Sequence, residues 1–215
     1  MSRVRPAVEI GVVLFLVFIS LWASQFLASA TWRSHLPMIT FLYVPFVCVF
    51  LLHRDAPRFG LHFSWPSARV WKIVGLTTLG VCVLYVLGDH VFRTKVQRAH
   101  LLWSNFPSIT VLTTQVAVQV LAVALPEEVF FRGYLQTRLE DVNGLRRCEV
   151  ALLVAAVLFA LSHVVGSFQV VRLLTFFPGL VFGWLWMKTR SLYAPILFHA
   201  FCNVLLFVQQ ALYVR

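Results

Sequence analysis

Long runs of apolar residues, separated by short polar stretches, dominate the chain. A helix needs about 20 mainly apolar residues to cross the hydrocarbon layer of a membrane. The pattern therefore predicts an all-α fold, a polytopic transmembrane helix bundle of about seven spans. The predicted spans are residues 7–30, 36–52, 70–92, 109–136, 149–168, 170–187 and 192–213.

Three of the apolar and aromatic segments have unusual features. The second predicted span is short and contains Pro37 and Pro45, so we expect it to be kinked or tilted. Residues 59–71 mix aromatic and basic side chains, which favours a segment lying on the membrane surface. The first apolar run follows two arginines and imitates a cleavable signal peptide, but its length favours an uncleaved first helix.

The composition agrees with a membrane protein. Hydrophobic residues make up 60% of the 215 residues and charged residues 12%, whereas charged residues make up about 25% of a typical soluble domain. A soluble fold of this size has too much surface for so few charges. The same composition excludes a disordered chain, a coiled coil and a disulfide scaffold. We expect a single integral membrane domain over residues 1–215.

The net charge of +10 is distributed as in the loops of a membrane protein. Lys and Arg fall in short clusters between apolar runs, so we expect contact with the lipid bilayer and no nucleic acid. With the N-terminus inside, the cytoplasmic loops hold about twice as many Lys and Arg as the opposite loops. We therefore expect a cytoplasmic N-terminus and a place in a bacterial inner (plasma) membrane. The clusters are Arg3/Arg5, Arg54/Arg58, Arg93/Lys95/Arg98, Arg146/Arg147 and Lys188/Arg190.

Several polar side chains lie inside predicted spans. An ionisable group at the centre of a span costs roughly 2.5–3.5 kcal/mol, so each such group suggests a function. At 1.5 Å per residue from the predicted cytoplasmic boundary, Glu127 lies about 16 Å deep and His163 about 21 Å deep. His199 and Asn203 lie about 14 and 20 Å deep by the same count. All four fall in one layer of a core roughly 30 Å thick, which indicates a single site.

Helical spacing separates the two adjacent glutamates. Glu128 and Arg132 are four residues apart, so they share a helix face and can form an ion pair. Glu127 has no such partner, and removal from water favours its protonated form, which suits a proton acceptor and donor. A buried, protonated Glu127 acting only as a hydrogen-bond donor stays an alternative. A purely structural role is also an alternative for His163 and Asn203, since intramembrane His and Asn often only form hydrogen bonds between helices.

Three motifs in this part of the chain match a known family. Glu127-Glu128-Val-Phe-Phe-Arg132, Phe159-Ala-Leu-Ser-His163 and His199-Ala-Phe-Cys-Asn203 occur in the family's order. Together they resemble the CAAX protease and bacteriocin-processing (CPBP) family of glutamic intramembrane proteases. The resemblance covers residues 109–210, which we expect to form the catalytic core.

The resemblance implies an intramembrane endopeptidase that cleaves a membrane-associated protein or peptide near its C-terminus. It implies that Glu127 is the general base to a water molecule and that His163 shares or orients this water. It implies that His199 and Asn203 stabilise the oxyanion of the tetrahedral intermediate. Glu128 and Arg132, by the same resemblance, orient Glu127 or the substrate backbone.

Other functions stay open at this point. Glu127, His163 and His199 could form a zinc site of a metal-dependent protease, although their sequence neighbours offer the two imidazoles no clear acceptor; we expect no cofactor. A non-enzymatic scaffold or immunity protein on the same fold is a second alternative. A proton-coupled transporter is a third, disfavoured because the chain has no repeated half. Prenylated proteins, secreted peptides and C-terminal sorting tails are equally compatible substrates, and the sequence does not indicate an oligomeric state.

Overall fold

A computed structural model describes residues 5–61, 65–142 and 148–214 of the chain. Across these residues, seven helical segments are long and apolar enough to cross a membrane, which confirms the predicted fold class. Six of the segments are built on α1 (Pro6–Ser24), α2 (Ala30–Leu51), α3 (Ala68–Val91), α7 (Cys148–Val165), α8 (Phe176–Thr189) and α9 (Tyr193–Leu212).

The remaining span, Ile109–Leu139, changes its helical form along its length. It contains two π-helical stretches. Such stretches are rare in proteins, and those that occur are often at functional sites. In order it consists of α4 (Ile109–Val118), the π-helix η4 (Gln119–Ala124), α5 (Leu125–Glu128), the π-helix η5 (Val129–Gln136) and α6 (Thr137–Leu139).

Short elements complete the chain between and after the spans. β1 pairs with β2 in the antiparallel direction and joins the C-terminal residues to the connection before α4. These elements are η1 (Ala56–Phe59), η2 (Phe92–Val96), β1 (His100–Leu101), η3 (Trp103–Asn105), η6 (Val170–Thr175) and β2 (Tyr213–Val214).

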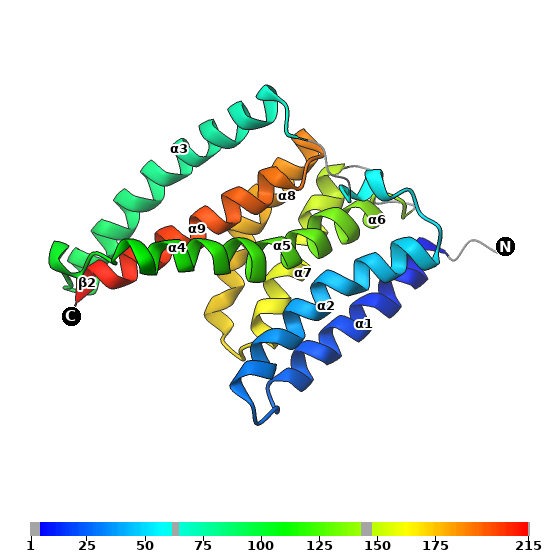
Figure 1. The fold of residues 1–215 in the computed structure, drawn as a ribbon, viewed down its shortest axis with the longest axis horizontal. Helices are drawn as coiled ribbons and strands as arrows, with labels where there is room; N and C mark the ends of the chain where they lie inside the picture. Colours follow the sequence, from blue (N-terminus) through cyan, green and yellow to red (C-terminus); the bar gives the residue numbers. More distant parts are fainter. Residues whose placement is uncertain (1–4, 62–64, 143–147, 215) are drawn as a thin grey trace.

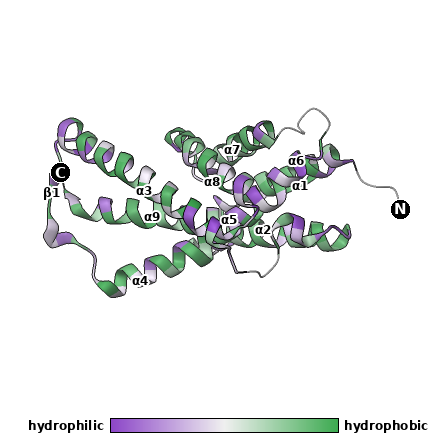
Figure 2. Cartoon of the chain, turned by 90° about the horizontal axis from the view of Figure 1, so that it is seen from above, coloured by the Kyte–Doolittle hydropathy of each residue, from purple (hydrophilic) through white to green (hydrophobic). Residues whose placement is uncertain are grey.

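The helices fan out from one corner of the molecule, where α6 and the end of α8 lie (Figure 1). From there α1 and α2 run toward one edge, whereas α3, α4 and α9 run toward another. Hydrophobic residues cover most of the helices, and hydrophilic residues gather in the middle of the bundle around α5 (Figure 2). The polar groups thus lie where the two sets of helices meet.

The centre of the bundle is the segment 128–139, in which each residue is buried. A helix that is buried on all sides must be surrounded by other elements. Here α2, α7, α8 and η1 all pack against η5. This central position fixes the adjoining α5, which carries Glu127 and Glu128.

The second span differs from its prediction. α2 begins at Ala30 rather than at residue 36, so it has 22 residues and is not short, and both prolines lie inside it. Its first turns look like a loop in the sequence because they are polar. The Ser34 hydroxyl and a His35 ring nitrogen bond to the Thr31 carbonyl, which satisfies these groups within the helix.

Only part of the segment 59–71, which was predicted to lie on the membrane surface, is exposed. Phe59, at the end of η1, is 2% exposed and stacks against Tyr134 of η5. Gly133 makes this insertion possible, because a Cβ at that position would lie 2.6 Å from the Phe59 carbonyl oxygen. Trp65 is 83% exposed, as a residue at the membrane surface should be. Residues 62–64 of this segment lie outside the described residues.

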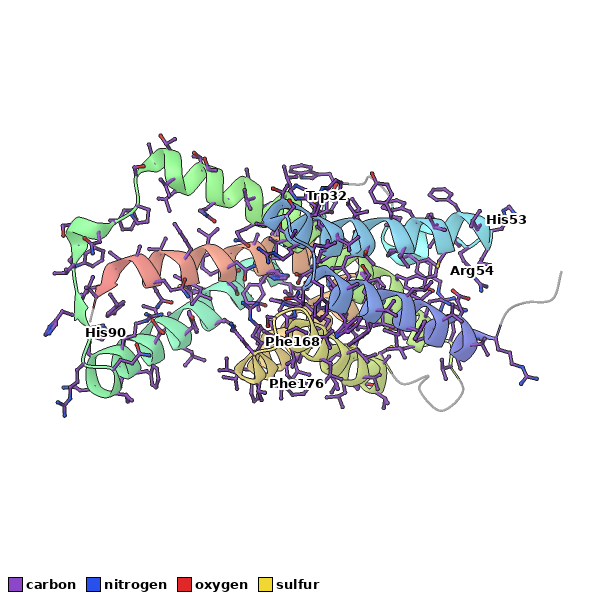
Figure 3. All side chains as sticks on the ribbon, turned by 90° about the horizontal axis from the view of Figure 1, so that it is seen from below. Trp32, His53, Arg54, His90, Phe168 and Phe176 are labelled. Atoms are coloured by element: carbon purple, nitrogen blue, oxygen red, sulfur yellow. The ribbon has the colours of Figure 1, made fainter. Side chains whose placement is uncertain are left out.

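A buried ion network joins α1 to the end of the fourth span. Glu9 of α1 is 5% exposed and accepts hydrogen bonds from Tyr134, Arg138 and Arg54. Figure 3 shows Arg54 at the end of α2, at the opposite end of the molecule from His90. The network makes α1 an integral part of the bundle.

The membrane orientation stays a prediction. The charge count assigns the N-terminal ends of α1, α3, α7 and α9 to the cytoplasmic side. Of the basic clusters behind this count, Arg3, Arg146 and Arg147 lie outside the described residues, as does Arg215.

Candidate active site

Four elements carry the predicted site residues. Glu127 and Glu128 end α5, and Arg132 follows in η5. His163 lies near the end of α7, and His199 lies in α9. The structure brings these five residues together in the middle of the bundle, although they come from three different spans.

Glu127 occupies the centre of the group. Its Oε2 atom lies 3.8 Å from Nε2 of His163 and 3.9 Å from Nε2 of His199. These separations are too long for direct hydrogen bonds and suit one water molecule bound between the carboxylate and each ring. Oε2 is buried and has no hydrogen-bond partner within the described part of the chain. This oxygen is therefore available to a molecule that enters the site.

Both imidazole rings are held by their Nδ1 atoms. Nδ1 of His163 donates to the Phe159 carbonyl at 3.0 Å, and Nδ1 of His199 donates to Oε1 of Glu128 at 2.8 Å. Because these oxygens only accept, Nδ1 carries the proton in each neutral ring, and the Nε2 lone pair faces Glu127.

The expectation that the two rings lack acceptors is therefore wrong. For His163 the acceptor is a backbone carbonyl one helical turn earlier, which side-chain identities do not reveal. For His199 it is Glu128, because one carboxylate oxygen accepts from the ring and from Arg132 at the same time.

Glu128 and Arg132 form the ion pair that their spacing predicts. Arg132 NH1 lies 3.1 Å from Glu128 Oε1, and the two side chains are 1% and 0% exposed. The guanidinium also donates to the Gly179 carbonyl of α8 at 3.1 Å and lies 4.3 Å from the centre of the Phe159 ring. The Arg132 guanidinium thus contacts groups other than Glu127. It holds Glu128 in place, and Glu128 in turn holds His199.

A second contact of the same kind was missed in the sequence. Gln136, one turn after Arg132, donates through Nε2 to the Gly183 carbonyl at 3.2 Å. The two donors and the two glycines are each four residues apart, so they form two parallel contacts between η5 and α8. A Cβ at Gly183 would lie 2.9 Å from Gln136 Oε1. This matched spacing was the available signal in the sequence.

Asn203 has a different partner from the other predicted residues. It lies one turn beyond His199 in α9, about 6 Å along the axis. Its Nδ2 donates to Oε1 of Gln119 at 2.9 Å, which leaves its second N–H available for another acceptor. Gln119 begins η4 and was also missed, although a polar residue inside an apolar span is itself a signal.

The arrangement is suited to acid–base chemistry. Two carboxylates face one guanidinium, so the group is net negative when both imidazoles are neutral. Across the described residues, no group of three His, Cys, Asp or Glu side chains is arranged to hold a metal ion. The site offers a carboxylate that can take a proton, two ring nitrogens and a carboxamide donor.

Comparison with known proteins identifies this part of the chain. Residues 108–205 match the profile of the type II CAAX prenyl endopeptidase Rce1-like family. No significant match was found among curated proteins or among solved structures. The matched segment contains the three predicted motifs and the π-helical span that carries Glu127 and Glu128. Residues 108–205 thus match the Rce1-like CAAX prenyl endopeptidase family, a family of membrane proteases.

Proposed function

We propose that the protein hydrolyses a peptide bond near the C-terminus of a membrane-associated protein, with Glu127 as general base to the attacking water. The position of Glu127 Oε2 between the Nε2 atoms of His163 and His199, without another partner in the described residues, carries this proposal. A general base must lie within reach of the proton that it takes, directly or through one water. The match of residues 108–205 to a protease family supports this function over a scaffold or a transporter.

The steps follow from the groups at the site. Glu127 takes a proton as water attacks the carbonyl carbon, and a tetrahedral intermediate with a negative oxygen forms. The C–N bond then breaks, and the proton passes from Glu127 to the leaving amine. His163 orients the water, because its Nε2 lone pair accepts the second water proton. The products are a carboxylic acid and an amine, and transfer of the acid proton to the amine leaves a carboxylate and an ammonium group.

His199 and Asn203 are the proposed oxyanion donors. His199, whose Nδ1 proton is held by Glu128, donates to the oxyanion only when Nε2 also carries a proton. Glu128 fixes the orientation of this ring through its hydrogen bond to Nδ1, as a carboxylate does in other carboxylate–imidazole pairs. Asn203 contributes the N–H that Gln119 does not use. Each such donor is worth about 10²–10³ in rate.

The direct test replaces Glu127 by Gln in the purified full chain. The substrates are a farnesylated peptide ending in a CAAX sequence, a peptide with a hydrophobic C-terminal tail and a secreted-peptide precursor. Cleavage by Glu127→Gln should fall about 10²–10⁴-fold because the amide cannot take up the proton. Thermal unfolding should stay close to that of the unaltered protein.

Glu149→Gln is the matched control, since Glu149 is exposed at the start of α7 and far from the site in the sequence. Its cleavage rate should equal that of the unaltered protein. A Glu127→Gln protein that cleaves at the unaltered rate contradicts the proposed role of Glu127. Failure of the unaltered chain to cleave any of the three peptides contradicts the proposed substrate class.

A further inference from the structure

A cavity of about 360 Å³ opens at the end of the bundle where α1 begins and α2 ends. It is separate from the candidate active site, since none of the predicted site residues lines it. Its walls are unusually rich in charge. Four arginines and two aspartates line it: Arg5, Arg54, Arg58, Arg138, Asp55 and Asp141.

The cavity lies at the level where three spans end. Arg5 immediately precedes α1, Arg54 lies three residues after α2, and Arg138 is the second-last residue of the fourth span. The hydrocarbon layer corresponds to the apolar spans, and the polar headgroup layer begins where they end. The arginines therefore lie at the depth of the lipid headgroups on one face of the membrane.

The guanidinium groups keep unused donors. Arg138 is occupied, because it bonds to both Glu9 and Asp141. Arg54 bonds to Glu9 through NH2 alone, and its buried Nε has no partner in the described residues. The Arg58 side chain is 47% exposed and uses NH2 for Asp141. Arg5 makes no side-chain hydrogen bond within the described part of the chain.

The charges of this group do not balance. Four guanidinium groups lie near three carboxylates, those of Glu9, Asp55 and Asp141. The excess positive charge and the free N–H groups are what an anion with several oxygens requires. Guanidinium groups match phosphate oxygens with paired hydrogen bonds, and basic pockets between spans at a membrane surface suit anionic lipid headgroups.

We propose that this cavity binds the phosphate group of an anion at the membrane surface, held by Arg5, Arg54 and Arg58. The volume accommodates a phosphate together with the first atoms of an ester substituent. Two sources share this chemistry: the headgroup of an anionic phospholipid and free phosphate from solution. Binding here fastens the start of α1 to the end of α2 and adds to the ion network around Glu9.

The test uses the purified full chain in detergent micelles, with phosphatidylglycerol, phosphatidylcholine and inorganic phosphate as separate probes. Native mass spectrometry counts bound lipid, and thermal unfolding reports the stabilisation by each probe. The unaltered protein should bind phosphatidylglycerol in preference to phosphatidylcholine. Arg5→Gln/Arg58→Gln should bind phosphatidylglycerol about 10-fold or more weakly, since each basic group near a membrane surface contributes substantially.

Arg69→Gln is the matched control, because Arg69 is exposed at the start of α3 and does not line the cavity. Its lipid binding should equal that of the unaltered protein. Arg54→Gln tests the buried guanidinium, and if that variant does not fold, the double variant with its two more exposed arginines decides the question. Displacement of phosphatidylglycerol by millimolar inorganic phosphate assigns the site to free phosphate, and its persistence assigns the site to the headgroup.

Two results overturn the proposal. One is equal phosphatidylglycerol binding by the unaltered protein and by Arg5→Gln/Arg58→Gln. The other is the absence of any preference over phosphatidylcholine together with no stabilisation by inorganic phosphate. Neither readout requires cleavage of a peptide, so the outcome is independent of the proposed protease function.

Discussion

Two buried groups of charges in this protein differ in how fully their carboxylates are bonded. In the network at the helix ends, each oxygen of Glu9 accepts from two donors, supplied by Tyr134, Arg54 and Arg138. In the candidate active site, Oε2 of Glu127 has no partner among the described residues, and neither has Oε2 of Glu128, whose Oε1 is bonded to His199 and Arg132. Both groups lie in an apolar bundle, where an unbonded carboxylate oxygen is costly.

The difference separates a structural carboxylate from a chemical one. Buried polar groups in native proteins are nearly always satisfied, so an exception calls for a reason such as a ligand or a reacting molecule. The four bonds to Glu9 leave it no free lone pair that points to solvent or substrate, and they hold α1 in place. Glu127 keeps an oxygen free for water. Substitutions at the two groups should therefore affect different properties.

Glu128→Gln should have the largest effect, because Glu128 both stabilises the fold through Arg132 and holds the site residue His199. The change leaves the buried Arg132 without its counter-charge and weakens the hold on His199. Loss of one partner of a buried ion pair costs about 3–5 kcal/mol of the free energy of unfolding. Denaturation in mixed micelles measures this loss, and the cleavage rate per folded molecule should fall as well. Glu128→Asp keeps the charge and should retain more of both; a Glu128→Gln protein as stable as the unaltered one contradicts this account.

Glu9→Gln should lower stability without affecting the chemistry. Arg54 and Arg138 would lose a charged partner, although Arg138 keeps Asp141, so the expected cost is about 2–3 kcal/mol. The cleavage rate per folded molecule should stay within about twofold, since Glu9 takes no part in the reaction. Parallel measurements of unfolding and of cleavage test the two halves of this expectation. A lower cleavage rate per folded molecule would contradict the separation of the Glu9 network from the candidate active site.

Gln119→Ala should have a smaller effect, and mainly on the reaction. The change removes the acceptor that fixes the carboxamide of Asn203, a contact worth about 1 kcal/mol. The expected result is a fall in kcat of about 10-fold with little change in KM, because a misdirected donor acts on the oxyanion and not on substrate binding. Gln115→Ala, one turn earlier in α4, is the control. Equal cleavage rates for Gln119→Ala and Gln115→Ala would contradict a role of Gln119 in positioning Asn203.

Treatment with a strong chelator should have no effect on cleavage. A zinc ion at the site would need Glu127 Oε2 and both Nε2 atoms at about 2.0–2.2 Å, which brings the ligand atoms about 3.3 Å from one another. The present separations of 3.8 and 3.9 Å are wider and suit water. Loss of activity that stoichiometric zinc restores would replace the glutamate mechanism by a metal-dependent one.

The sequence predicts the spans and the ionisable members of the site because an apolar environment makes such residues rare. Glu127, His163 and His199 come together as expected, from three spans and at similar depths. Gln119 and Gln136 were missed because they are uncharged, so each is a weaker signal inside an apolar span than an ionisable residue.

Other features depend on the backbone and not on the local pattern. The acceptor for His163 is a carbonyl, and the insertion of Phe59 depends on the close approach that Gly133 permits. The π-helical stretch Val129–Gln136 packs against several neighbouring elements, and no apolar periodicity predicts its π-helical form. The early start of α2 depends on polar side chains that bond within their own helix.

The bonds of Glu9 also bear on the order in which the protein is assembled during its synthesis. Glu9 enters the membrane with the first helix, whereas Arg138 follows 129 residues later. At about 5–20 residues per second, roughly 6–26 s pass between the two. Glu9 lies only three residues from the start of α1, so it can stay at the wet surface of the membrane during this interval. Arg54 can pair with Glu9 once the second span has emerged, but Glu9 gains its full set of bonds only after the fourth span has followed.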